Sequence, residues 1–342
     1  MTRLPSLDGL RAVSILLVLL SHCAICTGFP DAWRPVARHG EVGVTVFFVI
    51  SGFLITLLLV NEQQIRGAID LKAFYLRRAF RILPVFLLYT LFIVLWKNVE
   101  PITISRSNLL HALTFTVNFD WQRDWFIGHY WTLSVEEQFY LLFPPLVLLF
   151  RKTLKPVLIL LIAYSCLARV IGYKYPDTGA YFLSPFFSYA DAILAGVLGA
   201  LLYHRRPEII RKKIFTNGWL QFAAFSLISF FLYASGGGKW AWLSLPFGPM
   251  AIAFAILFLI LCYLNPLNKV AYRLLNSRVL VHIGLLSYSI YVWQQFFFVG
   301  RLQVIWRVLP FNLAAIYLVA LASYFLWEKP FLRLRKHFIT VH

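Results

Sequence analysis

The residues best suited to chemistry are Arg11 and His22, which share one apolar segment near the N-terminus. Ionisable residues in a membrane-length apolar segment are costly, so they are functional-site hypotheses by default. On a helix, eleven residues return to within about 20° of the same direction, so both side chains share a face. A lone buried histidine is usually a structural hydrogen-bonding group. Sharing a face with Arg11, after Asp8 one turn earlier, favours an imidazole that exchanges protons near neutral pH.

Three arginines, Arg77, Arg78 and Arg81, form a second group just before an apolar segment. Their i,i+3 and i,i+4 spacings would present two or three guanidinium groups together on a helical start. Planar guanidinium groups bind phosphate through paired hydrogen bonds. The alternative is that these charges only anchor the cytoplasmic end of a membrane span, with their stems along the lipid. Both interpretations remain open on the sequence.

Two adjacent acids, Glu136 and Glu137, lie in the segment WTLSVEEQFY that begins at Trp131. The spacing of Ser134 and Glu137 predicts a capping box at the start of a helix, which would explain Glu137 structurally. Glu136 would point about 100° away around the helix and needs another explanation. We therefore expect Glu136 to be the better candidate for chemistry.

Other polar groups carry weaker predictions. Asp191 lies in an apolar run, where it could face a polar cavity or pair with a basic residue of another helix. Glu328 stands before Lys329–Pro330 and is expected to end the last span. Neither a zinc-type His/Cys set nor a GxSxG elbow occurs, so no metal is expected. We expect the four cysteines to pack against apolar residues and not to form a disulfide framework, because all four lie in apolar stretches: Cys23, Cys26, Cys166 and Cys262.

The composition indicates that the segments which position these residues are surrounded by lipid as well as by water. The chain has 342 residues, of which 13% are charged and 60% hydrophobic, with a mean hydropathy of +0.73. Soluble domains carry about 25% charged residues. The sequence therefore predicts an all-α polytopic membrane helix bundle of about ten transmembrane helices, forming one membrane domain over 1–342. Segments of about 20 apolar residues place these spans near 10–28, 43–60, 84–99, 133–150, 156–172, 187–203, 216–235, 246–264, 280–298 and 311–327. The aromatic stretch 105–131 is expected along an interface.

The distribution of basic residues predicts the orientation. With the N-terminus inside, 22 of the 32 Lys and Arg fall in cytoplasmic segments and 10 on the other side. This asymmetry predicts that both termini are cytoplasmic. It also assigns the formal charge of +18 to membrane topology, with the lipid bilayer and no nucleic acid as partner. His22 would lie about 18 Å from the cytoplasmic start of its span, past the middle of the bilayer core.

Taken together, these residues resemble the acyltransferase-3 family of membrane O-acyltransferases. The similarity covers nearly the whole chain in the right order. Its pieces are Leu7-Asp-Gly-Leu-Arg11 with His22, Gly43-x4-Phe-Val-Ile-Ser51-Gly-Phe-Leu-Ile55, Arg77-Arg78-x-x-Arg81-Ile-Leu-Pro84, Trp131 to Tyr140, Tyr288-Ser-Ile-Tyr291-Val-Trp293 and Glu328-x-Pro330. Relatives often have His where Gln294 follows the Tyr-x-Trp motif, so a second imidazole at that position is not expected here.

The resemblance implies an enzyme that moves an acyl group, commonly acetyl, from cytoplasmic acyl-CoA to a hydroxyl of a glycan, lipid-linked sugar or similar acceptor. It implies a catalytic role for Arg11 and His22 and contact of the arginine group with the CoA phosphates. Glu136 could stabilise charge or orient the imidazole. Further candidates are Asp8, Ser51, Trp131, Glu137, Asp191, Tyr288 and Tyr291.

The resemblance also implies a stand-alone form without a C-terminal esterase-like domain, in the bacterial cytoplasmic (inner) membrane. A transporter is the main alternative, because intramembrane ionisable residues also build substrate pathways. A non-catalytic membrane sensor is the third interpretation. The sequence does not indicate the oligomeric state.

Overall fold

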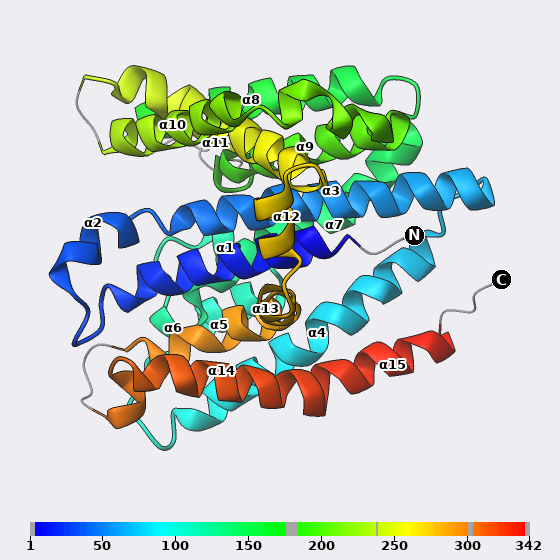
Figure 1. Ribbon diagram of the computed structural model, residues 1–342. Helices are drawn as coiled ribbons and strands as arrows, with labels where there is room; N and C mark the ends of the chain where they lie inside the picture. Colours follow the sequence, from blue (N-terminus) through cyan, green and yellow to red (C-terminus); the bar gives the residue numbers. More distant parts are fainter. Residues whose placement is uncertain (1–3, 176–183, 237–238, 300–303, 339–342) are drawn as a thin grey trace. The chain divides into compact units, whose positions relative to one another are not determined.

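The computed structural model describes residues 4–175, 184–236, 239–299 and 304–338 (Figure 1). Within these ranges every regular element is helical, which confirms the all-α prediction. Eight helical segments of the described chain are long and apolar enough to cross a membrane. The protein is therefore an integral membrane protein.

Two expected spans need separate mention. The segments expected at 133–150 and 280–298 coincide with α7 (Tyr130–Leu149) and α13 (Arg278–Phe297), each 20 residues long. Neither is among the eight. The total of ten and the cytoplasmic position of both termini therefore stay predictions. Arg3 and Arg301, which enter the charge count, lie outside the described residues.

The chain divides into two compact units, and each is described by itself. Unit 1 consists of residues 1–14, 42–69 and 135–284, and unit 2 of residues 15–41, 70–134 and 285–342. Several helices, among them α7 and α13, run from one unit into the other. Seven of the eight helical segments of membrane length overlap with α1 (Pro5–Cys23), α3 (Glu41–Arg66), α4 (Leu71–Trp96), α8 (Leu154–Lys174), α9 (Ser184–Arg205), α10 (Gly218–Ser235) and α11 (Ala241–Tyr263), and the eighth is Phe311–Arg335.

In unit 1, the helices α8, α9, α10 and α11 pack side by side (Figure 1). Helices α3 and α9 approach each other closely at two glycines. A Cβ at Gly52 of α3 would lie well under 3.0 Å from the carbonyl oxygen of Ile193, and one at Gly196 of α9 equally close to that of Val49. Small residues at a helix crossing allow such backbone approach, which drives helix association in membranes.

A larger side chain at this crossing should therefore destabilise unit 1. We expect Gly52→Leu to lower the free energy of unfolding by about 1–3 kcal/mol, because the side chain must push two backbones apart. Gly218→Leu is the matched control, since a Cβ there meets nothing within 4 Å. Thermal unfolding of the detergent-purified variants measures the difference. Equal melting temperatures for both variants would contradict the close crossing.

In unit 2, the C-terminal segment extends further than the sequence predicts. Helix α14 (Phe311–Ser323) passes through a π-helical turn, Tyr324–Glu328, into α15 (Lys329–Phe338), which packs against α4. The prediction that Glu328 ends the helix is wrong. Pro330 directly follows the residues of the π-helical turn and Lys329 within this continuous helical segment, and Glu328 is buried and accepts a hydrogen bond from Ser289 Oγ at 3.0 Å.

The third span also begins earlier than expected, at Leu71 instead of residue 84. The Asp70 side chain caps its first turn by accepting from the backbone N–H of Ala73 at 2.9 Å. Pro84 therefore lies inside α4. Two side chains of unit 2 donate to backbone carbonyls in this turn of α4: Tyr288 to Ile82 O at 2.7 Å, and Trp327 to Pro84 O at 2.8 Å. These bonds connect α4 to α13 and to the π-helical turn at Tyr324–Glu328.

The segment expected along an interface, 105–131, forms short helices: α5 (Arg106–Leu113), a 3-10 turn at Val117–Phe119 and α6 (Trp125–Gly128). A buried ion pair lies just before it. Arg307 donates to both carboxylate oxygens of Glu100 at 2.7 and 2.8 Å, and Trp96 Nε1 donates to the same group at 3.0 Å. The Arg307 hydrogen bond is the main reason why the pKa of Glu100 is held below its usual value.

This pair should make the stability of the protein depend on pH. Because the pKa of folded Glu100 is depressed, its contribution is present at neutral pH and is lost as the pH falls through that pKa. We expect Glu100→Gln to cost about 3–5 kcal/mol at pH 7, since it leaves the Arg307 charge buried. Thermal unfolding of the parent protein and the variant is measured from pH 7 to pH 3, and the difference between their melting temperatures should shrink as the pH falls. A difference in melting temperature that does not depend on pH would contradict the charge-based explanation.

Candidate active site

Helix α1 carries both Arg11 and His22, as expected, but its bounds differ from the expected span. It begins at Pro5 and ends at Cys23 instead of covering 10–28. His22 therefore lies in the last turn of the helix, and its depth past the middle of the bilayer stays a prediction. Asp8 and Arg11 lie in the first two turns, where an acid favourably meets the N-terminal end of the helix dipole. The backbone carbonyl of Asp8 packs against Gly284.

An aromatic setting in unit 2 surrounds the His22 imidazole. Its ring stacks on Phe298 with centroids 5.9 Å apart and meets Trp125 edge-on at 6.1 Å. The side chain of Gln294 is fully buried and lies near the imidazole, but among the described residues no hydrogen-bond partner is found for Gln294 Nε2 and Oε1 or for His22 Nδ1. His22 itself is half-buried. The two rings restrict the orientation of the imidazole, which is partly exposed.

Gln294 stands where relatives often carry a histidine, and the structure gives this departure a meaning. An amide can donate to or accept from one ring nitrogen of His22, but it does not titrate. Gln294 therefore supplies no second proton-transfer group near His22. Trp125 is held in place in turn, since its Nε1 donates to the backbone carbonyl of Gln295 at 3.0 Å.

A second histidine, His129, belongs to the same unit and was missed by the sequence analysis. It is buried and packs against Tyr89, Tyr130 and Tyr291, with ring centroids 4.7 to 5.6 Å away. Burial lowers the pKa of His129 to about 3, and the nearby His22 adds to this shift. His129 is therefore a neutral hydrogen-bonding group at physiological pH.

One ring nitrogen of His129 has an assigned role. Nε2 lies 3.1 Å from the backbone carbonyl of Val292, so the neutral tautomer with Nε2–H donates there. Nδ1 is then a buried acceptor for which no hydrogen-bond partner is found. The signal in the sequence was the position of His129 directly before the Tyr130–Trp131 pair. We had assigned that stretch to a membrane interface.

The two motif tyrosines have structural contacts in unit 2. Tyr291 Oη lies 2.6 Å from Thr132 Oγ1 and donates to the carbonyl of His129 at 2.8 Å. Tyr288 bonds to the turn of α4 that contains Ile82. Trp131 faces the guanidinium of Arg123 at 5.9 Å from its ring centroid. The Tyr and Trp motifs thus fix the start of α7 and the middle of α13, close to His129.

The three candidate arginines lie inside α4 instead of in a loop before it. Arg78 lies over the Phe74 ring at 5.9 Å. Arg335 of α15, which the sequence analysis had counted only as a topology signal, interacts electrostatically with Arg77 and Arg81. Like charges gathered in this way raise the free energy of the site unless an anion offsets it. We call Arg77, Arg78, Arg81 and Arg335 the arginine cluster.

In unit 1, the structure joins two of the candidate residues. Ser51 Oγ of α3 donates to a carboxylate oxygen of Glu136 on α7 at 2.6 Å. Helix α7 begins at Tyr130, so Ser134 lies within it and cannot be its N-cap. Ser134 Oγ instead donates to Tyr130 O at 2.9 Å and accepts from Val117 N at 3.1 Å. The capping-box prediction is wrong, and Glu137 is a half-buried residue in the second turn of the helix.

Asp191 has the second of its two predicted environments, pairing with a basic residue. Arg169 of α8 forms a salt bridge with it at 2.8 Å, and both side chains are almost fully buried. Arg169 also donates to the carbonyls of Ser188 and Pro246 at 3.1 and 2.7 Å. This pair connects α8, α9 and α11 and has a structural role.

All four cysteines are free and buried. Among the described residues, no group of three or more His, Cys, Asp and Glu could hold a metal ion.

Comparison with known proteins identifies the class. Residues 4–328 match the family model described as "Acyltransferase domain", Acyl_transf_3. The chain therefore belongs to the acyltransferase-3 family. It is 27% identical over 319 residues to "O-acetyltransferase OatA" from two Staphylococcus aureus strains, NCTC 8325 / PS 47 and COL, covering 85% of this chain and 50% of each relative.

A third relative is "Putative O-acetyltransferase SACOL0978" of S. aureus strain COL, 27% identical over 325 residues, with 86% of this chain and 50% of the relative covered. The chain thus spans about half the length of the curated relatives it matches. No solved structure matched the chain.

The Asp191 pair yields a prediction that separates a structural acid from a catalytic one. Asp191→Asn should destabilise the protein by about 3–5 kcal/mol, because it leaves Arg169 buried without its counter-charge. The double variant Arg169→Met/Asp191→Leu should recover much of that loss, since it removes both buried charges. Thermal unfolding in detergent measures both. A double variant no more stable than Asp191→Asn would contradict the pairing.

Proposed function

We propose that this protein is a membrane O-acyltransferase that moves an acyl group, acetyl in the simplest case, from cytoplasmic acyl-CoA to a hydroxyl group. A glycan, a lipid-linked sugar or a similar molecule would be the acceptor, and the bacterial inner membrane the location. Family membership over residues 4–328 is the observation that carries this proposal. The relatives named O-acetyltransferase support acetyl as the acyl group.

His22 is the proposed proton acceptor. In the direct route, it takes the proton of the acceptor hydroxyl as the oxygen attacks the thioester carbon, the C–S bond breaks, and CoA leaves as the thiol after receiving a proton. In the covalent route, a His22 ring nitrogen attacks the thioester carbon, the C–S bond breaks and CoA leaves as the thiol. The acceptor hydroxyl oxygen then attacks the acyl carbon, the C–N bond breaks and the imidazole is restored with the hydroxyl proton. The contacts of His22 with Trp125 and Phe298 suit both routes, because they orient the ring.

Other charged residues have supporting roles in this proposal. The arginine cluster suits the phosphates of CoA, since guanidinium groups pair well with phosphate oxygens. Arg11 and Glu136 are candidates to stabilise charge that develops during transfer. The hydrogen bond from Ser51 gives the Glu136 carboxylate a defined orientation, which such a role requires.

The role of His22 can be tested with purified protein, labelled acetyl-CoA and a glycan acceptor. We expect His22→Ala to reduce transfer by about 10²- to 10⁴-fold, the usual contribution of a general base. His111→Ala is the matched control from the same unit, because that half-buried histidine bonds only locally, to Thr116. Full activity of His22→Ala would remove His22 from the mechanism. Transport of the acceptor without acylation would instead favour the transporter alternative.

The arginine cluster has a test based on donor chemistry. We expect Arg81→Gln and Arg335→Gln each to raise KM for acetyl-CoA by about 5- to 150-fold, the range for losing a charged hydrogen bond of 1–3 kcal/mol. The KM for acetyl-pantetheine, which has no phosphate, should stay unchanged. Arg333→Gln, an exposed neighbour on α15, is the control. Equal changes for both donors would show that the cluster does not contact phosphate.

A further inference from the structure

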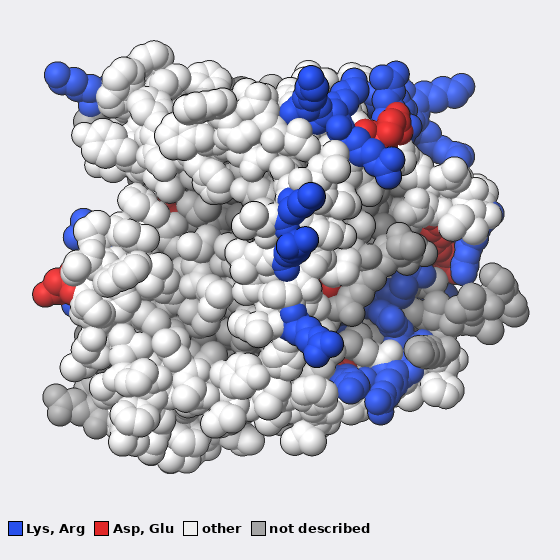
Figure 2. Space-filling model, in the orientation of Figure 1, with Lys and Arg blue, Asp and Glu red and all other residues white. Residues whose placement is uncertain are grey.

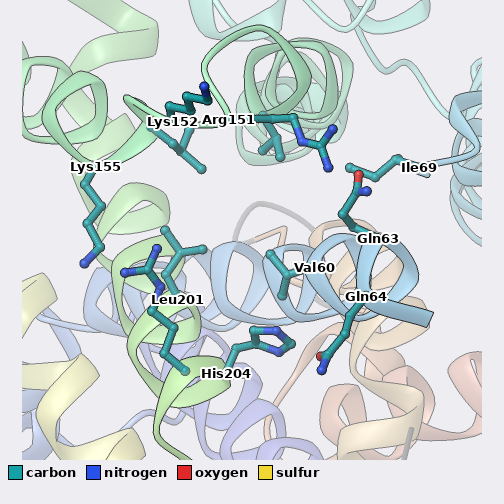
Figure 3. Close-up of a pocket in the computed structure, with 12 residues that line it drawn as sticks. Val60, Gln63, Gln64, Ile69, Arg151, Lys152, Lys155, Leu201 and His204 are labelled. Carbon is teal, nitrogen blue, oxygen red and sulfur yellow. The ribbon is translucent and has the colours of Figure 1, made fainter. Parts of the chain in front are cut away.

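Unit 1 contains a pocket of about 340 Å³ that the proposed reaction does not use (Figure 3). Its walls come from the last turns of α3, the end of α7, the start of α8 and the last turn of α9. Five basic residues line it: Arg151, Lys152, Lys155, His204 and Arg205. All five lie in segments that the charge distribution predicts to be cytoplasmic. The arginine cluster is a separate feature, on α4 and α15 of unit 2.

The chemistry of this pocket, which we call the basic pocket, favours an anion. Among the described residues that line it, none is Asp or Glu, while Gln63 and Gln64 add amide groups. The Arg151 and Lys155 side chains extend from one side of the cavity toward the walls made by α3 and α9 (Figure 3). In the space-filling view, Lys and Arg gather at the same end of unit 1 (Figure 2). Like charges held around one cavity are stabilised when a polyvalent anion enters.

An aliphatic surface accompanies this charge. Val60, Val147 and Leu201 form part of the pocket wall. Next to the pocket, Ile65 is 80% exposed and Leu149 is 78% exposed. Exposed aliphatic side chains suit contact with acyl chains, and a basic pocket between helix ends at the cytoplasmic surface is typical of sites for lipid phosphate.

We propose that the basic pocket binds the phosphate group of an anionic ligand, with the ligand's aliphatic part on the Val60, Val147 and Leu201 wall. Two sources share this chemistry: the headgroup of an anionic phospholipid, and the phosphates of CoA. The aliphatic wall and the exposed neighbours favour the phospholipid. The inference is independent of acyl transfer, because binding is measured without an acceptor and without turnover.

The test is a charge-matched comparison. The variant Arg151→Gln/Lys155→Gln/Arg205→Gln removes three charges from the pocket. The control Arg206→Gln/Arg211→Gln/Lys212→Gln removes three exposed charges from the same surface, outside the pocket lining. Detergent-purified proteins are titrated with phosphatidylglycerol, with zwitterionic phosphatidylethanolamine and, separately, with 3′,5′-ADP, and bound ligand is counted by native mass spectrometry.

We expect the pocket variant to bind phosphatidylglycerol about a hundredfold more weakly, since each basic residue near an anionic headgroup contributes about a factor of five. The control and phosphatidylethanolamine binding should change little. Loss of 3′,5′-ADP binding instead of lipid binding would keep the phosphate pocket and identify CoA as its source. Equal loss in variant and control, or no loss in either, overturns the proposal. Arg151→Gln alone, expected to weaken binding about fivefold, provides the same readout should the triple variant not fold.

Discussion

The absence of water inside the bilayer governs most of this structure. A polar group within a membrane span must find its partner inside the protein, because an unmet group costs several kcal/mol there. Asp191 is held by Arg169, Glu328 by Ser289 and Glu136 by Ser51. Each bond joins two different helices. The few polar residues of the spans therefore determine which helix faces meet, a task that apolar contacts alone perform poorly when lipid is equally apolar.

The same constraint explains the backbone of the spans. Helices must approach closely where their packing depends on van der Waals contact, and Gly52 and Gly196 allow this between α3 and α9. In the turn of α4 that contains Pro84, Tyr288 and Trp327 donate to the carbonyls of Ile82 and Pro84. Glycine and proline residues within the apolar segments thus lie where one helix contacts another.

The sequence could predict the existence of the helices, because runs of apolar residues have a length set by the bilayer. It could not predict where α4 begins or where the C-terminal helix ends. A helix continues past the hydrocarbon core of the bilayer wherever the charged residues that follow also favour helix. Arg77 and Arg335 both lie in such extensions. The local Ser134–Glu137 pattern misled because the helix begins a turn earlier, at Tyr130.

The candidate site shows the same limit. Residue type and spacing identified His22, and Ser51 and Glu136 were found by motif. Their partners lie far away in sequence, as Gln294 and Phe298 do from His22, and only tertiary structure brings them together. His129 stands directly before Tyr130 and Trp131, and it was missed because that stretch is predicted to lie along a membrane interface.

Charge placement finally separates structural from ligand-binding groups. A basic side chain that meets a carboxylate at helix-packing distance, as Arg169 and Arg307 do, has its counter-charge built into the chain and needs no ligand. Basic side chains that converge on one another repel, so each added charge raises the electrostatic free energy of the group. The basic pocket is of this second kind, because none of the described residues that line it is Asp or Glu. Such an arrangement is maintained at lower cost when an anion occupies it, which is why the basic pocket is interpreted as a phosphate site and the buried pairs as structural.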